Sequence, residues 1–136
     1  MSRSTNRRDR FAEALFALRI GVFIVMLLWT LDKFINPGHS GNVFSNFYGL
    51  DIGNSLLYAV GAIQLVIVLG FVAGAYKRYT YGLVLLMHTV STLASWQQYL
   101  APWDNLLFFA AWPMLAACFA LYRLRDYDQL LAWDSR

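Results

Sequence analysis

Hydrophobic residues along the chain gather into four long runs that are separated by short polar stretches. The runs cover residues 11–31, 55–75, 81–99 and 105–124. Each holds about 20 residues, and an α-helix of that length, at about 1.5 Å per residue, crosses the roughly 30 Å hydrocarbon core of a bilayer. The runs are too long and too uniformly apolar for the strands of a membrane barrel. The pattern therefore predicts an all-α protein, a four-helix transmembrane bundle that forms one integral membrane domain over residues 1–136.

The third run is the most polar of the four, and its polar residues share one helix face. They fall at positions i, i+3, i+4 and i+7, and they are His88, Ser91, Thr92 and Ser95. Gln64 lies near the middle of the second run. In a bundle such side chains turn inward and hydrogen-bond between helices. The alternative is a ligand pocket or a proton path in which His88 is the group that titrates.

The composition agrees with a lipid environment. Apolar residues make up 59% of the chain and charged residues only 14%, whereas soluble domains average about 45–50% and about 25%. The net charge of +3 does not indicate nucleic acid, because the cations lie at the ends of the apolar runs. Cys118 is the only cysteine, which excludes an intrachain disulfide, and we expect it to be an inert packing residue. No cysteine–histidine spacing typical of a metal site is present, so no metal is predicted.

The cations are divided unequally between the two sides of the predicted bundle. Only Lys33 falls on one side, while nine of the eleven Lys and Arg residues flank the runs on the other: Arg3, Arg7, Arg8, Arg10, Lys77, Arg78, Arg123, Arg125 and Arg136. The positive-inside rule therefore predicts that both termini are cytoplasmic. No cleavage site of small residues follows the first run, so we expect an uncleaved first span. The sequence thus predicts a multi-pass protein, in a bacterium one of the inner membrane.

Two cations bracket the almost uninterrupted apolar stretch, residues 20–31, that ends the first run. Arg19 must lie within the span, because too few apolar residues follow it to cross a membrane alone. It either extends toward the cytoplasmic surface or pairs inside the bundle with an acid such as Glu13 or Asp126. Lys33 follows fourteen residues later, about 21 Å along the same helix face. Asp32 stands beside it, where the predicted bilayer meets water.

Residues 18–34, LRIGVFIVMLLWTLDKF, join an arginine, an apolar run that contains glycine and a Lys-Phe pair. This stretch resembles the opening of the DoxX-like family of small four-helix membrane proteins, although the family often has glycine where this chain has Thr30. The resemblance implies a membrane component of a redox system. Relatives include the small quinone-reducing subunit of thiosulfate:quinone oxidoreductase and subunits that serve thiol or oxidative-stress chemistry.

Polar and aromatic side chains gather at the predicted non-cytoplasmic rim, where they offer a candidate quinone site. A quinone ring needs an apolar slot with polar groups at its carbonyls, and Lys33 is suited to donate to one of them. The candidate ligand-binding residues are Arg19, Asp32, Lys33, Gln64, His88, Trp96, Gln97 and Trp103. No catalytic residue is predicted. No haem is expected, because His39, the second histidine, lies in an external loop and not at the depth of His88.

Two other functions are open at this point. The chain is either a redox protein or a structural, accessory subunit of a larger membrane complex, docked through a GxxxG face at Gly70 and Gly74. A small transporter is less favoured, because no carboxylate lies in the middle of a predicted span. The expected partners are the lipid bilayer and membrane or redox subunits. The polar tail, residues 126–136, is expected to continue the fourth helix or to lie on the membrane surface.

Overall fold

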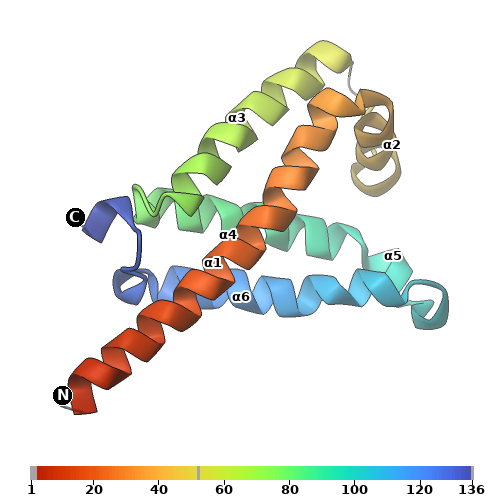
Figure 1. Cartoon of the computed structure of the whole chain (residues 1–136). Coiled ribbons are helices and arrows are strands. Elements are labelled where there is room, and N and C mark those ends of the chain that lie inside the picture. The colour runs from red at the N-terminus through yellow and green to blue at the C-terminus, as the bar shows by residue number, and fades with distance from the viewer. Residues whose placement is uncertain (1–2, 52, 136) are drawn as a thin grey trace.

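The computed structural model describes residues 3–51 and 53–135. The regular secondary structure of these residues is helical, and none of them forms a β-strand (Figure 1). Side chains are described from residue 7 to residue 134 apart from residue 52. The helices are α1 (Arg3–Ile35), α2 (Pro37–Tyr48), α3 (Asn54–Val72), α4 (Lys77–Ala94), α5 (Trp96–Tyr99) and α6 (Ala111–Arg123). Short 3-10 turns complete the chain: η1 (Pro102–Asp104), η2 (Leu106–Ala110), η3 (Arg125–Tyr127) and η4 (Trp133–Ser135).

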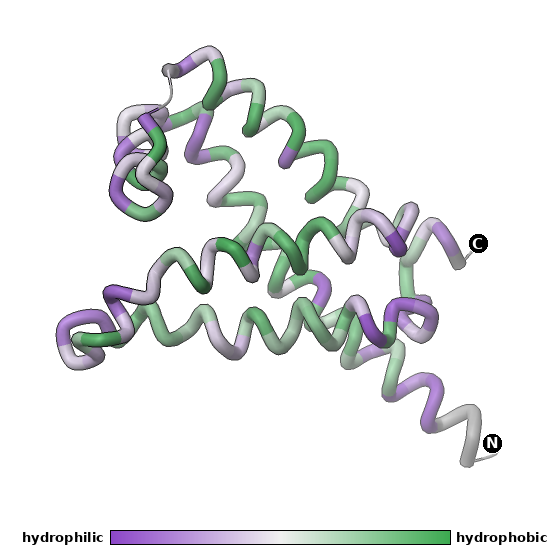
Figure 2. Tube along the Cα trace, turned by 180° about the vertical axis from the view of Figure 1, so that it is seen from behind, coloured by the Kyte–Doolittle hydropathy of each residue, from purple (hydrophilic) through white to green (hydrophobic). Residues whose placement is uncertain are grey.

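Three helical segments are long and apolar enough to cross a membrane: Arg7–Ile35, Asn54–Val72 and Leu106–Arg123. Figure 2 shows that hydrophilic residues concentrate near the ends of the helices and in the connecting segments, while the middles are largely hydrophobic. Many large apolar side chains are exposed along the helices, as a lipid solvent allows. These features indicate a membrane protein. Helix α4 is not among the three segments, since it begins with Lys77 and Arg78 and carries His88 in its interior.

The four long helices pack as two pairs, α1 with α3 and α4 with α6. Figure 1 shows α1 crossing the α4–α6 pair obliquely, while its N-terminal end projects past the rest of the molecule. The core lies around this crossing, and all four helices contribute to it: Leu15, Val22, Met26, Val68, Phe71, Tyr81, Val84, Cys118 and Leu121. Cys118 is 1% exposed and packs in this cluster, which confirms the packing role predicted for it.

Helix α2 contains His39 and occupies the segment that the sequence predicted to be an external loop. Its sequence contains Gly, Asn and Ser, which are poor helix formers. Pro37 favours its first turn because the proline ring fixes φ and the missing N–H has no helical partner there. Gly49 ends it with φ of 67°, a left-handed conformation that glycine adopts without strain. The ring of Phe47 then contacts that of Phe108 in η2, with centroids 6.0 Å apart.

The chain beyond α6 folds back onto the turn between α3 and α4. The backbone N–H of Trp133 donates to the carbonyl of Ala73 at 2.7 Å. The carboxylate of Asp134 accepts hydrogen bonds from the N–H groups of Tyr76 and Lys77, at 2.8 Å each, and so caps the start of α4. The tail therefore does not continue the last helix, but is a folded part of the protein.

The predicted GxxxG face is wrong, because Gly74 is not helical. Helix α3 ends at Val72, and Gly74 has φ of 64° in the following turn. A Cβ atom at Gly74 would lie 2.6 Å from the Cβ of Ala132, so this glycine makes room for the folded tail. Gly61 and Gly70 of α3 do admit neighbouring helices, since a Cβ would meet Phe34 of α1 at the first and Thr80 of α4 at the second, each at 2.9 Å.

Candidate functional site

Arg19 is completely buried, and its guanidinium is surrounded by groups of the same chain. It lies 3.3 Å from the carboxylate of Asp128, with both side chains 0% exposed. It also donates to the Tyr81 hydroxyl at 3.5 Å and to the backbone carbonyls of Leu130 and Leu131, the latter at 3.2 Å. Of the three guanidinium nitrogens, Nε alone has no hydrogen-bond partner among the described residues. Of the two alternatives for Arg19, the structure shows pairing inside the protein and not extension toward the surface.

The acid that pairs with Arg19 was not among those suggested by the sequence. Glu13 and Asp126 are both exposed, and Asp128, two residues further along, is the partner instead. The Tyr81 hydroxyl donates to the same carboxylate at 2.5 Å. Lys77 donates to the carbonyls of Arg125 and Asp128, the former at 3.0 Å. The residues Arg19, Lys77, Tyr81 and Asp128 form what we term the Arg19 centre.

The Arg19 centre joins α1, α4 and the folded tail. A buried ion pair is stable only when further hydrogen bonds surround it, and here the tyrosine and two carbonyls supply them. Its two cations and the carboxylate are engaged with one another or with the backbone. This centre is therefore best understood as a structural joint between the tail and the helices.

Lys33 lies near the C-terminal end of α1 and has fewer polar contacts than Arg19. It is 8% exposed, and its ammonium donates to the carbonyl of Trp29 at 3.4 Å. The ammonium also lies 5.9 Å from the ring centroid of Phe44 in α2. The described part of the chain brings no carboxylate within ion-pair distance of it. Lys33 is thus a buried cation that retains unused capacity to donate hydrogen bonds.

Asp32 adjoins Lys33 in the sequence but makes its close contacts elsewhere. Its carboxylate is 2.7 Å from Nδ1 of His39 and accepts a hydrogen bond from the Ser40 hydroxyl at 2.6 Å. Both partners lie in the first turns of α2, so Asp32 ties the start of α2 to the end of α1. This attachment holds α2, and with it Phe44, beside Lys33.

His88 of α4 is a second buried polar group near Lys33, and it is 1% exposed. Its Nε2 is 2.9 Å from the carbonyl oxygen of Ala111, at the start of α6. Its Nδ1 has no hydrogen-bond partner among the described residues. Thr92, one turn on, is also 1% exposed, so the polar stripe of α4 faces inward as predicted.

Trp29 links Lys33 and His88. Its carbonyl accepts from Lys33, while its indole stacks on the His88 ring with centroids 6.1 Å apart and planes 30° apart. We term Trp29, Lys33, Phe44 and His88 the Lys33 centre. The sequence analysis did not single out Trp29, although its position four residues before Lys33, on the same helix face, was a usable signal.

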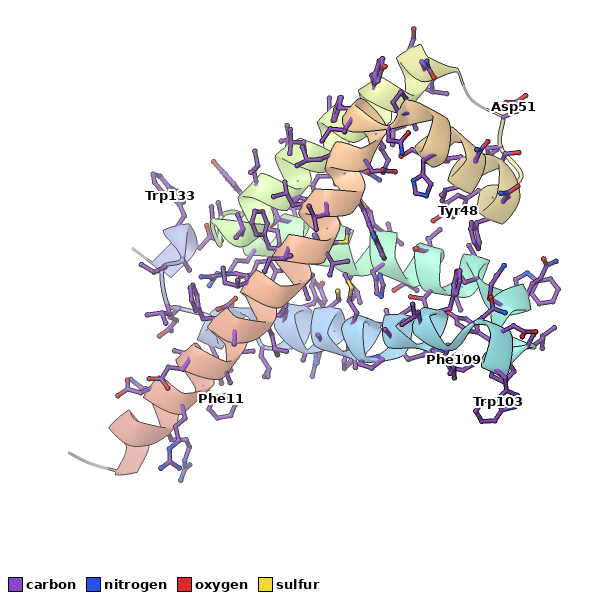
Figure 3. All side chains as sticks on the ribbon, turned by 45° about the vertical axis from the view of Figure 1, so that its right-hand side comes forward. Phe11, Tyr48, Asp51, Trp103, Phe109 and Trp133 are labelled. Atoms are coloured by element: carbon purple, nitrogen blue, oxygen red, sulfur yellow. The ribbon has the colours of Figure 1, made fainter. Side chains whose placement is uncertain are left out.

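The remaining predicted site residues do not join the Lys33 centre by any described contact. Trp96 and Trp103 are 57% and 84% exposed, and Gln97 is also exposed. Figure 3 shows Trp103 pointing away from the molecule at the far end of the α5–α6 connection. Gln64 is half-buried on α3. Of the predicted set, the structure brings together Lys33 and His88 with Asp32 at their border, and assigns Arg19 to a separate centre.

An open groove of about 490 Å³ lies between α4 and α6. Its lining is almost entirely apolar: Leu85, Thr89, Trp112, Leu115, Ala116 and Phe119. The Thr89 hydroxyl donates to the Leu85 carbonyl of its own helix at 2.7 Å, so the groove offers an apolar surface and little else. No three His, Cys, Asp or Glu side chains among the described residues are grouped closely enough to hold a metal ion.

Neither known protein families, nor functionally described proteins, nor solved structures match this chain in sequence or fold. The candidate site therefore rests on the contacts described above. The Arg19 centre has its charges matched by its own chain. The Lys33 centre combines a buried donor, a buried acceptor and two aromatic rings, which is the set of groups that binds a flat polar ring.

Proposed function

We propose that the chain is a four-span protein of a bacterial inner membrane with both termini in the cytoplasm. The unequal division of the cations supports this orientation, since Lys77 belongs to the Arg19 centre, Arg125 contacts it through its carbonyl, and Lys33 lies fourteen residues further along α1. Helix α4 is the fourth span. Its polar residues His88 and Thr92 are buried, and its exposed face carries Leu83, Leu86, Val90 and Leu93.

We further propose that this membrane protein is DoxX-like and serves a redox process, with a quinone as the ligand of the Lys33 centre. The observation that carries this proposal is the poorly matched ammonium of Lys33, buried with one carbonyl and one ring as its described contacts. A buried charge without a counterion is costly. Proteins retain such a group where a ligand uses it, so the cost itself favours a functional role.

The chemistry of a quinone suits the groups of this centre. An ammonium donates a hydrogen bond to a ring carbonyl and stabilises the negative charge that develops there on reduction. The aromatic rings of Trp29 and Phe44 offer flat apolar surfaces for the ligand ring. The chain itself supplies no electron carrier in this proposal, so the two electrons that reduce the bound quinone come from a partner redox subunit.

The test is a binding measurement on the whole chain in lipid nanodiscs with a short-chain ubiquinone analogue. Replacing Lys33 by Met keeps an apolar stem beside Gly61 and removes the charge-assisted hydrogen bond. Such a bond contributes about 1.5–3 kcal/mol, so we expect affinity to fall about tenfold or more. The matched control is Arg78→Met, an exposed cation at the start of α4, which should bind as the wild type does.

Equal affinity in the Lys33→Met and wild-type chains would contradict a quinone site at this centre. The accessory-subunit function predicts a different outcome. Mild extraction would then recover the chain with a larger complex, and the isolated chain would bind no quinone in either form.

A further inference from the structure

Lys33 gives the Lys33 centre a hydrogen-bond donor, and His88 gives it a hydrogen-bond acceptor. Its Nε2 lies 2.9 Å from the Ala111 carbonyl oxygen, and a carbonyl can only accept. This nitrogen therefore carries the hydrogen. In a neutral imidazole the other nitrogen, Nδ1, is then a hydrogen-bond acceptor.

The neutral form of His88 follows from its surroundings. The imidazole contacts the Trp29 indole and the Ala111 carbonyl, and none of the described ion pairs brings a carboxylate to it. A buried imidazole without an anionic partner stays uncharged. Its Nδ1 is thus a buried acceptor for which the described residues supply no donor.

We propose that Nδ1 of His88 accepts a hydrogen bond from a ring hydroxyl of the ligand, and that the Lys33 centre consequently binds a quinol more tightly than the corresponding quinone. This inference rests on the proposed function. A quinone has only carbonyl oxygens, which accept from Lys33 but cannot donate to His88. A quinol can do both, since each of its hydroxyl groups donates one hydrogen and still accepts from the ammonium.

Trp29 gives the ligand its route to His88. The indole stacks on the imidazole, and Trp29 is 48% exposed. The lone pair of Nδ1 lies in the plane of the imidazole, so a ligand hydroxyl reaches it at the edge of the ring while the ligand ring lies against the exposed indole.

The experiment compares the affinities of the whole chain in nanodiscs for a short-chain ubiquinol and for its quinone, kept reduced or oxidised during calorimetry. One neutral hydrogen bond corresponds to a preference for the quinol of about threefold to tenfold. His88→Phe retains a stacking ring but no acceptor and should abolish the preference. His88→Gln keeps an amide donor for Ala111 and an acceptor oxygen, and should retain it. Thr89→Val, the next residue of α4, is the matched control and should behave as the wild type does.

The outcomes separate this inference from the function on which it rests. If the wild-type chain binds neither form, the proposed function fails and the inference fails with it. If it binds both forms with equal affinity, or if His88→Phe leaves the preference for quinol unchanged, the inference alone is overturned.

Discussion

Helix α1 carries two buried cations on nearly one face, and they are solvated by the protein in very different ways. Arg19 meets a carboxylate, a tyrosine hydroxyl and two carbonyls. Lys33 meets one carbonyl, at 3.4 Å, and one aromatic ring. The comparison teaches that a charge within a membrane span does not by itself indicate a ligand site. What matters is whether the same chain supplies its counter-groups, because a matched charge joins elements and an unmatched one remains available to a ligand.

The largest effect should come from removing the acid of the Arg19 centre. Asp128→Ala leaves Arg19 buried without its counterion, and breaking a buried ion pair from one side costs about 3–5 kcal/mol. We expect a loss of this size in the free energy of unfolding, measured by denaturant titration in detergent micelles. Asp126→Ala, an exposed acid two residues earlier, is the control and should change stability by less than about 0.5 kcal/mol. Equal small losses in both variants would contradict a structural role for the Arg19 centre.

A somewhat smaller effect is expected at the turn that receives the folded tail. Gly74→Ala places a Cβ against Ala132 and forces a left-handed φ on alanine, which together cost about 2 kcal/mol. The tail should separate from the α3–α4 turn, and limited proteolysis after residue 124 should become faster. Gly53→Ala, where nothing lies within 4 Å of the new Cβ, serves as the comparison and should leave the proteolysis rate unchanged. A tail that stays protected in Gly74→Ala would show that its docking does not depend on this glycine.

A third substitution removes only the cap of α4. Asp134→Ala loses two hydrogen bonds to the N–H groups of Tyr76 and Lys77, and a lost N-cap typically costs about 1 kcal/mol. Hydrogen exchange at these two amides should accelerate, while exchange in the middle of α3 should not change. The same substitution at Asp104, an exposed residue of η1, should alter neither. Unchanged protection of both amides in Asp134→Ala would mean that other groups cap α4.

The smallest change in stability is expected at the Lys33 centre. Lys33→Met removes a buried charge that has no described counterion, so the free energy of unfolding should stay the same or rise slightly. Arg19→Met, at the matched centre, should lower it by several kcal/mol because Asp128 is left unpaired. Denaturant titration of the two variants side by side measures the difference. A loss at Lys33 as large as that at Arg19 would mean that both centres are structural.

The sequence predicted the helical class, three segments apolar enough to cross a membrane and the inward-facing stripe of α4, because these follow from local hydrophobicity and periodicity. The fourth span, over residues 81–99, stays a prediction. It left open whether Arg19 extends toward the surface or pairs internally, and it did not suggest Asp128 as the acid, since that residue lies in a polar tail far along the chain. Helix α2 was missed because Pro37 and Gly49 define its ends while its interior composition favours a loop. The role of Gly74 depends on a positive φ that no pattern revealed.

The candidate site was predictable in part for a similar reason. His88 stands out as an ionisable residue within an apolar run and Lys33 as one just beyond the end of another, and both are buried. Trp29 did not stand out, because a tryptophan on a membrane helix resembles any other aromatic residue at an interface. The exposed Trp96 and Trp103 were included on the same aromatic criterion, and no described contact brings them to the Lys33 centre. Which nitrogen of His88 is unpaired depends on Ala111, a contact between helices that spacing alone does not encode.

The most direct test of this account is the shift in thermal unfolding midpoint caused by a saturating short-chain quinone in the wild-type and Lys33→Met chains. A ligand that binds only the folded state at about 100 times its Kd stabilises it by about 2.7 kcal/mol. We predict a rise in the wild-type midpoint of several degrees and a much smaller rise in Lys33→Met, which folds equally well without ligand. An equal rise in both chains, or none in the wild type, would contradict the assignment of the Lys33 centre as the binding site.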